Sequence, residues 1–136
     1  MSIGQKVADA AEALVGTPFR LQGRTPATGL DCIGLVHCAL SQAGLSPVAP
    51  DGYRLRNVEI AGFLAFAERS GLVSASGPPM PGDVLLTRPG AAQHHLYVAL
   101  DGGRFVHAHA GIRRVVLHAA PLAQPILRHW RPQNQE

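Results

Sequence analysis

The chain has 136 residues and a mass of 14.4 kDa, the size of one compact domain. Hydrophobic residues make up 46%, too many for a disordered chain, and no apolar run approaches the ~20 residues that a membrane-spanning helix needs. The formal charge is +3, with arginines scattered rather than gathered in the basic stripes of nucleic-acid binders. We therefore expect no membrane span and no nucleic-acid partner, and the basic balance favours a smaller anionic partner.

The first half of the chain carries helical patterns. Glycine and proline are frequent in residues 16–30, which predicts a loop there. Asp31 and Asn57 each stand where a helix N-cap belongs, directly before an apolar-periodic segment. Apolar residues at three- and four-residue steps predict three helices, over about residues 3–15, 32–43 and 58–69.

The second half of the chain carries strand patterns. Three prolines and two glycines in residues 74–82 mark the change from one region to the other. Beyond them the apolar period becomes two, and the segment 101–103 (DGG) has the composition of a tight hairpin. Helices followed by an antiparallel sheet make an α+β fold, which we expect to be one domain over residues 1–136. The predicted strands are residues 83–87, 95–100, 104–109, 113–118 and 126–130.

Two cysteines, Cys32 and Cys38, lie six residues apart on the second predicted helix. Their Cα atoms would be ~9 Å apart, beyond the ~7 Å limit for a disulfide, so both are expected to be free. Cys32 falls in the first turn, where the helix dipole and unpaired N–H groups favour a thiolate and lower the thiol pKa. Cys32 is therefore the candidate nucleophile, and Cys38 is assigned to the core.

Six of the seven histidines follow residue 93, and hairpin geometry decides which can act together. A three-residue loop at 101–103, with glycine in the left-handed conformation, places His95 opposite His109 and Tyr97 opposite His107 on one face. A two-residue loop would put His95 and His107 on opposite faces. The two glycines favour the longer loop. His94 then points to the other face, and His37, His118 and His129 are expected to be structural or exposed.

This register makes a Cys–His–His arrangement possible, with Cys32 as nucleophile, His95 as base and His107 orienting the base. A zinc site is the alternative, because His107 and His109 would share one face with Cys32 nearby. However, the chain has no C-x-x-C or H-E-x-x-H spacing. We therefore expect no metal and no cofactor.

Five segments match a known pattern in its order, and the two histidines of the pattern, His95 and His107, are twelve positions apart. They resemble the motifs of the NlpC-type (NlpC/P60) cysteine peptidases, which are papain-like cell-wall enzymes. The resemblance covers roughly residues 14–118. The five segments are residues 16–20 (GTPFR), 29–36 (GLDCIGLV), 81–84 (PGDV), 95–100 (HLYVAL) and 105–108 (FVHA).

The resemblance implies a papain-like fold, with the nucleophile at a helix N-terminus and N-terminal helices packed on a C-terminal antiparallel sheet. It implies hydrolysis of amide bonds in peptidoglycan stem peptides, commonly between γ-D-glutamate and a diamino acid. Cys32, His95 and His107 would form the triad, and the Cys32 backbone N–H would bind the oxyanion. The candidate substrate-binding residues are Phe19, Asp31, Tyr97 and His109.

Asp31 has two interpretations, as a helix cap and as a carboxylate for a substrate ammonium group. Five arginines in or beside loops are candidates for binding substrate carboxylates, because guanidinium groups pair with them in two-pronged fashion. These arginines are Arg20, Arg54, Arg88, Arg113 and Arg114.

Two positions depart from the family pattern. Phe19 replaces a tyrosine whose hydroxyl is expected to serve the oxyanion site or the substrate, and Ile33 replaces a frequent serine. The D-C-hydrophobic-G-L-V form of residues 31–36 resembles the subgroup of the family that is carried on the tails of phages and gene transfer agents. Because residues 1–16 do not resemble a secretion signal, we expect synthesis in the cytoplasm and delivery on a virion tail tip to the periplasm or cell wall, with tail-hub or baseplate proteins as partners.

Two other functions stay open at this point. One is a catalytically weak or inactive structural module of a tail tip with the same fold, for which Phe19 is the main support. The other is a papain-like thiol hydrolase or acyltransferase that acts on a different amide or ester.

Overall fold

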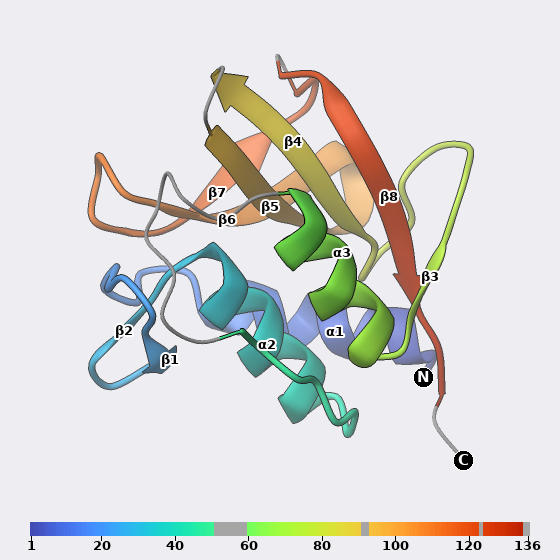
Figure 1. Cartoon of the computed structure of the whole chain (residues 1–136), viewed down its shortest axis with the longest axis horizontal. Helices are drawn as coiled ribbons and strands as arrows, with labels where there is room; N and C mark the ends of the chain where they lie inside the picture. The colour runs from blue at the N-terminus through green and yellow to red at the C-terminus, as the bar shows by residue number, and fades with distance from the viewer. Residues whose placement is uncertain (51–59, 91–92, 123, 135–136) are drawn as a thin grey trace.

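The computed structural model describes residues 1–50, 60–90, 93–122 and 124–134. In these residues three helices lie against one side of a six-stranded antiparallel sheet, and residues 2–4 lie close to residues 131–132 (Figure 1). The elements are α1 (Ile3–Ala13), β1 (Arg24–Thr25), β2 (Gly29–Leu30), α2 (Cys32–Gln42), α3 (Ile60–Arg69), β3 (Leu72–Ser74), β4 (Val84–Gly90), β5 (Gln93–Ala99), β6 (Arg104–His109), β7 (Arg114–Ala119) and β8 (Ile126–Pro132).

The predicted α+β order of helices before strands is confirmed, with differences at the ends of elements. The first helix stops at Ala13, two residues early, because Leu14 caps it and Gly16 adopts a left-handed φ of 94°. The second helix begins at Cys32 as predicted, with Asp31 as its N-cap. The third begins at Ile60, and its expected cap at Asn57 lies outside the described residues.

Three short strands were not predicted. The loop expected over residues 16–30 contains the two-residue strands β1 and β2, which pair with each other. Residues 72–74 form β3, which pairs with β8 at the edge of the sheet. Strands of two or three residues are too short to show an alternating pattern, and these form because a partner strand supplies their hydrogen bonds.

The sheet has the strand order β3-β8-β4-β5-β6-β7, so β7 would be an edge strand. Residues 16–19 cover this edge: the Phe19 N–H donates to the Arg113 carbonyl at 2.9 Å, and the Val115 N–H donates to the Thr17 carbonyl at 2.8 Å. On their other side the Leu30 N–H donates to the Pro18 carbonyl at 2.8 Å. The segment before α2 is thereby fixed to the sheet.

The hairpin between β5 and β6 has the predicted three-residue loop. The Leu100 N–H donates to the Arg104 carbonyl at 2.8 Å, and Val98 pairs with Val106. Gly102 and Gly103 have φ of 70° and 71°, a conformation that side chains with a Cβ rarely adopt. This register places the odd-numbered residues of both strands on one face.

The two faces of the sheet bury different cores. The even-numbered residues of β5 and β6, among them Leu96, Val98 and Val106, pack against the helices. The opposite face carries a smaller cluster of Leu85, Tyr97, Ala99 and Phe105, covered by Leu122. Leu122 belongs to the connection from β7 to β8, two strands separated by three others, so this connection crosses the second face.

A buried ion cluster links β4 to β8. Asp83 is 0% exposed, and Arg131 binds both its carboxylate oxygens at 2.9 Å. His129 Nε2 lies 2.6 Å from Oδ2, which also accepts the Met80 N–H at 2.9 Å. Burial raises the pKa of this carboxyl, but the hydrogen bonds from Arg131, Met80 and His129 outweigh burial and hold the pKa below its usual 3.8.

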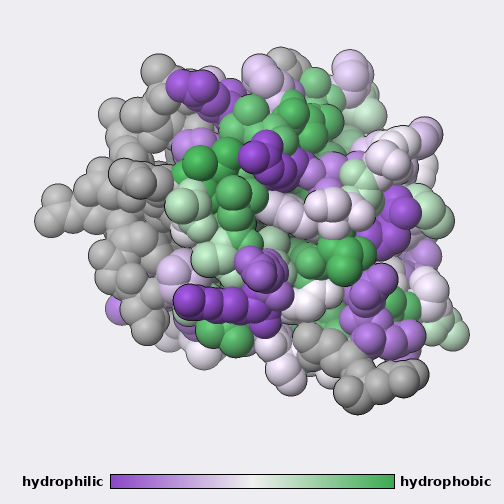
Figure 2. All heavy atoms as spheres, turned by 45° about the vertical axis from the view of Figure 1, so that its right-hand side comes forward, coloured by the Kyte–Doolittle hydropathy of each residue, from purple (hydrophilic) through white to green (hydrophobic). Residues whose placement is uncertain are grey.

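The surface is mixed in character. On the face seen in Figure 2, apolar areas are interrupted by hydrophilic side chains. Among the described residues nine large hydrophobic side chains are exposed, but they are spread over the chain start, the loops and the three strands β3, β7 and β8. Within the described residues, none of the helices has the length and apolar character needed to cross a membrane.

We predict that Asp83→Asn lowers the free energy of unfolding at pH 7 by about 3 kcal/mol, because it leaves Arg131 and His129 without their shared charge. The folded-state pKa of Asp83 is lowered, so its contribution is complete above about pH 4 and is lost as the pH falls through the folded value. Urea unfolding at pH 7 and pH 3 measures this, with exposed Asp101→Asn as the control. Equal losses in both variants would contradict it.

Candidate active site

Asp31 fixes the start of α2. Its Oδ1 accepts the Gly34 N–H at 2.8 Å, and its Oδ2 accepts the Gln22 N–H at 2.8 Å. Arg24 of β1 lies 3.2 Å from Oδ1. Asp31 is 1% exposed, so the structure shows the helix-cap interpretation, whereas a contact with a substrate ammonium group stays a prediction.

Glycine is needed at position 34 because the β1–β2 hairpin lies directly on the first turn of α2. A Cβ at Gly34 would collide with the Gly23 carbonyl oxygen. The D-C-x-G pattern therefore has a structural cause: the aspartate caps the helix and the glycine admits the hairpin that the aspartate holds.

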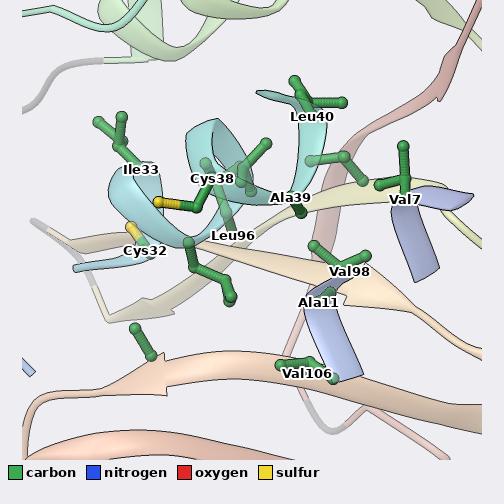
Figure 3. Close-up of a cluster of buried hydrophobic side chains, with 14 of the residues drawn as sticks. Val7, Ala11, Cys32, Ile33, Cys38, Ala39, Leu40, Leu96, Val98 and Val106 are labelled. Atoms are coloured by element: carbon green, nitrogen blue, oxygen red, sulfur yellow. The ribbon is translucent and has the colours of Figure 1, made fainter. Parts of the chain in front are cut away.

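Cys32 occupies the first turn of α2 and is 7% exposed. Figure 3 shows its side chain beside Leu96 of β5, and the Leu96 backbone N–H interacts with the thiol. Leu96 directly follows His95. The thiol is thus placed against the backbone of the strand that carries the candidate base. Cys38 lies deeper in the same helix, and both cysteines are free, as predicted.

His95 and His107 are hydrogen-bonded to each other. His95 Nε2 lies 2.8 Å from His107 Nδ1, and the two rings are nearly perpendicular with centroids 5.0 Å apart. The bond occupies Nε2 of His95 and leaves Nδ1 as the ring nitrogen able to act on another group. His107 is 6% exposed, so its ring has little freedom to turn away.

Tyr97 supports this histidine pair. Its ring centroid lies 4.5 Å from that of His107 and 5.1 Å from that of His95. Its hydroxyl donates to Gln124 Oε1 at 3.3 Å, and the Thr87 hydroxyl donates to the same oxygen at 2.7 Å. Tyr97 is buried, and its expected contact with substrate stays a prediction.

Two further histidines border the pair. His109, expected at the rim, has its ring 5.5 Å from that of His107, and its Nδ1 accepts the Ile112 N–H at 3.1 Å. The ring centroid of His118, a residue expected to be structural or exposed, lies 5.7 Å from that of His107 and 5.9 Å from that of Tyr97. His118 reaches this face of the sheet because it pairs with Phe105 in the β6–β7 register. Without that register the sequence could not place His118 near His107.

Two other histidines lie as expected, and two polar residues near the histidine pair were not predicted. His94 points to the helix side as predicted, where its ring contacts Phe63 of α3. His129 is structural, bound to Asp83. Thr87 and Gln124 were missed: Thr87 pairs with His95 in the β4–β5 register, and Gln124 sits on a connection that shows no pattern in the sequence.

Phe19 stands between the helix start and the sheet edge. It is partly buried against the core, its N–H binds the Arg113 carbonyl, and it pairs with Leu30, two residues before Cys32. A phenyl ring has no hydrogen-bond donor, so this position lacks the hydroxyl expected of a tyrosine.

The thiol pKa differs from the sequence-based expectation. Burial, followed by the Asp31 charge, raises the pKa of Cys32 to about 12. The backbone N–H groups of Leu96, Ile33 and Cys32 favour the thiolate, as expected at a helix N-terminus, but they do not outweigh burial. The prediction of a lowered pKa is therefore wrong for the free protein, in which the thiol is neutral at pH 7.

Both imidazoles are also neutral. Burial and then the proximity of His109 lower the pKa of His95 to about 4. Burial and then the neighbouring His95, His109 and His118 lower the pKa of His107 to about 3. Down to about pH 4, His95 therefore keeps a lone pair that can accept a proton. The thiol of Cys32 is therefore neutral, and His95 and His107 form a neutral, hydrogen-bonded imidazole pair.

Among the described residues, no group of three or more His, Cys, Asp or Glu side chains is arranged to hold a metal ion. The rings of His95, His109 and His118 each contact that of His107, with centroids 5.0–5.7 Å apart.

The fold and the site define a papain-like α+β domain, with a cysteine at a helix N-terminus against the backbone of the strand that carries one residue of a histidine pair. The NlpC/P60 family matches residues 16–131, and the chain belongs to this family. Among curated proteins, none matches the chain at a significant level.

Solved structures with this fold are similar to the chain at low sequence identity. NlpC2 from Trichomonas vaginalis aligns with a TM-score of 0.71 and 17% identity, over 98% of this chain and 48% of that one. The NlpC/p60 domain of the peptidoglycan hydrolase SagA aligns at 0.60 and 22%, over 96% and 98%. The peptidoglycan hydrolase RipB from Mycobacterium tuberculosis aligns at 0.60 and 18%, over 95% and 63%. The chain thus spans about half the length of the Trichomonas protein.

We predict that the free protein reacts slowly with iodoacetamide at pH 7, because only the thiolate attacks and the pKa of Cys32 is about 12. In a Cys38→Ala background, where one thiol is left, the labelling rate measured by intact mass should rise about tenfold per pH unit up to at least pH 10. His95→Ala should leave this dependence unchanged. A rate plateau below pH 7 that His95→Ala abolishes would instead reveal a preformed thiolate–imidazolium pair.

Proposed function

We propose that the chain is a cysteine endopeptidase that hydrolyses amide bonds in peptidoglycan stem peptides. The observation that carries the proposal is the 2.8 Å hydrogen bond between His95 Nε2 and His107 Nδ1, with the Cys32 thiol against the backbone of the residue after His95. This arrangement gives a nucleophile, a base and a group that orients the base.

In the first step His107 Nδ1 accepts the Nε2–H of His95, which leaves the lone pair of His95 on Nδ1. The thiol proton of Cys32 moves to this nitrogen as the sulfur bonds to the scissile carbonyl carbon. Because both groups are neutral beforehand, charge separates only when the carbonyl oxygen becomes an oxyanion. The backbone N–H of Cys32, at the positive end of α2, stabilises that oxyanion.

In the second step the protonated His95 gives its proton to the leaving nitrogen, the C–N bond breaks and a thioester remains on Cys32. A water molecule then transfers a proton to His95 and attacks the thioester carbonyl. Collapse of this intermediate releases the carboxylic acid, and the sulfur regains its proton from His95. His95 carries the proton in every transfer between Cys32, the leaving nitrogen and water.

Family membership and the names of similar structures support the substrate class. SagA and RipB are peptidoglycan hydrolases, and the motifs of this chain lie in the order of the NlpC/P60 family pattern that they resemble. We propose the γ-D-glutamyl–diamino acid link as the bond cleaved, on the family resemblance. Digestion of purified stem peptides, with mass analysis of the fragments, identifies the bond.

We also propose that a phage-like or gene transfer agent tail carries the chain to the cell wall, with tail-hub or baseplate proteins as partners. Its support is the D-C-hydrophobic-G-L-V form of residues 31–36, which resembles tail-associated members of the family. The chain should then be found by mass spectrometry in purified particles, at a constant ratio to the tail proteins. Particles that lack it would contradict this proposal without affecting the enzymatic one.

We predict that Cys32→Ala abolishes stem-peptide hydrolysis, and that His95→Ala lowers kcat about 10²–10⁴-fold through loss of the base. His107→Ala should cost less, since it removes only the group that orients His95. Cys38→Ala, on the same helix, is the matched control and should retain activity. Chromatographic assay of the products measures each rate, with circular dichroism to verify folding. Undiminished activity in Cys32→Ala would exclude the mechanism.

A catalytically weak structural module of a tail tip is the second candidate, favoured by Phe19 and by the raised pKa of Cys32. An oxyanion donor contributes about 10²–10³ in rate. If Phe19 limits activity, Phe19→Tyr should raise kcat at least about tenfold, as measured in the same assay. No hydrolysis by either the wild type or Phe19→Tyr would favour the structural module.

A further inference from the structure

Three exposed arginines gather where the sheet edge meets the helix start. Arg113 and Arg114 lie at the β6–β7 turn, and residues 18–19 pair alongside them. Arg20 follows directly, its N–H donating to the Leu30 carbonyl at 3.2 Å. Two segments far apart in the sequence thus place three arginines at one edge of the sheet. We term these residues the arginine rim: Arg20, Arg113 and Arg114.

The arginine rim adjoins both halves of the candidate active site. Arg114 pairs with His109, whose ring contacts that of His107. Phe19 binds Arg113 through its backbone and pairs with Leu30, two residues before Cys32. The rim therefore spans the distance from the histidine face of the sheet to the start of the nucleophile helix.

The arginine rim has no carboxylate partner within the described part of the chain. Two buried carboxylates form ion pairs with other arginines: Asp31 pairs with Arg24, and Asp83 pairs with Arg131. None of the three rim guanidinium groups takes part in an ion pair or a side-chain hydrogen bond there. Three adjacent positive charges without a counter-charge repel one another and favour an anionic ligand.

Arg113 is also held in an unfavourable backbone conformation. Its φ is 65°, in the left-handed region that glycine or asparagine usually occupies. The turn is closed by the Arg113 N–H donating to the His109 carbonyl at 2.8 Å, a bond that any residue could make. Glycine would therefore suit the turn better than arginine, so the structure of the turn does not account for the guanidinium group.

We propose that the arginine rim binds a free carboxylate of the peptide substrate and so selects peptides that carry this charge next to the scissile bond. The inference rests on the proposed peptidase function. Guanidinium groups bind carboxylates in two-pronged fashion, and the contact weakens with ionic strength because the rim is exposed. The substrate would then be held at two points: its free carboxylate at the arginine rim and its scissile carbonyl at Cys32.

The test compares two synthetic stem peptides that differ only in having free carboxylates or carboxamides beside the scissile bond. Binding is measured by calorimetry to the Cys32→Ala protein, and kcat/KM is measured with the active chain. The acid should bind about tenfold more tightly than the amide, the order expected for hydrogen bonds to a charged group. In an Arg20→Gln/Arg113→Gly/Arg114→Gln variant the preference should fall to about one.

Arg113→Gly alone separates recognition from stability. It should leave resistance to urea equal or raised, because glycine relieves the positive φ, and yet reduce the preference for the acid. Arg128→Gln removes an exposed arginine on β8 and should change neither property.

The outcomes distinguish the two proposals. Equal binding of acid and amide, or no binding of either, overturns the role of the arginine rim. A preference that the triple variant retains also overturns it. If the acid is bound selectively and neither peptide is cleaved, the rim is supported and the peptidase function is not.

Discussion

The Asp31 carboxylate is the interaction on which the site depends. It caps α2, holds the Gln22 N–H and pairs with Arg24, so one buried charge joins the helix start to the β1–β2 hairpin. Since the hairpin is continuous with the segment that covers β7, the same carboxylate links Cys32 to the sheet edge. Its charge also raises the pKa of the neighbouring thiol, so the group that positions the nucleophile opposes its ionisation.

Burial sets the electrostatics of the site. Cys32 and His107 are buried and His95 is partly buried, and for each of them burial is the largest cause of a pKa shift toward the neutral form. A neutral resting site keeps its strongest interactions for the moment when charge develops on the substrate carbonyl, in a region where water screens little. The exposed arginine rim provides the complementary long-range charge outside this neutral centre.

The sheet uses its two faces for different purposes. Leu96 and Val98 point to the helices and form the main core, whereas the neighbouring His95 and Tyr97 point to the face that holds the histidine cluster. A shift of one residue in the β5–β6 register would exchange these sets. The loop with Gly102 and Gly103 in the left-handed conformation fixes that register, so a turn distant from Cys32 determines which imidazoles form the pair.

The sequence by itself determined the order of the three helices and the five longer strands, the start of α2 at Cys32 and the hairpin register, because capping, periodicity and turn chemistry are local. The family motifs added the match of Cys32, His95 and His107. The tertiary structure decided what depends on distant partners: the raised pKa of Cys32, the entry of His118 and Gln124 into the histidine cluster, the strand β3 and the pairing of Pro18 with Arg114. Burial and non-local pairing arise from packing segments far apart in the chain, and no local pattern records them.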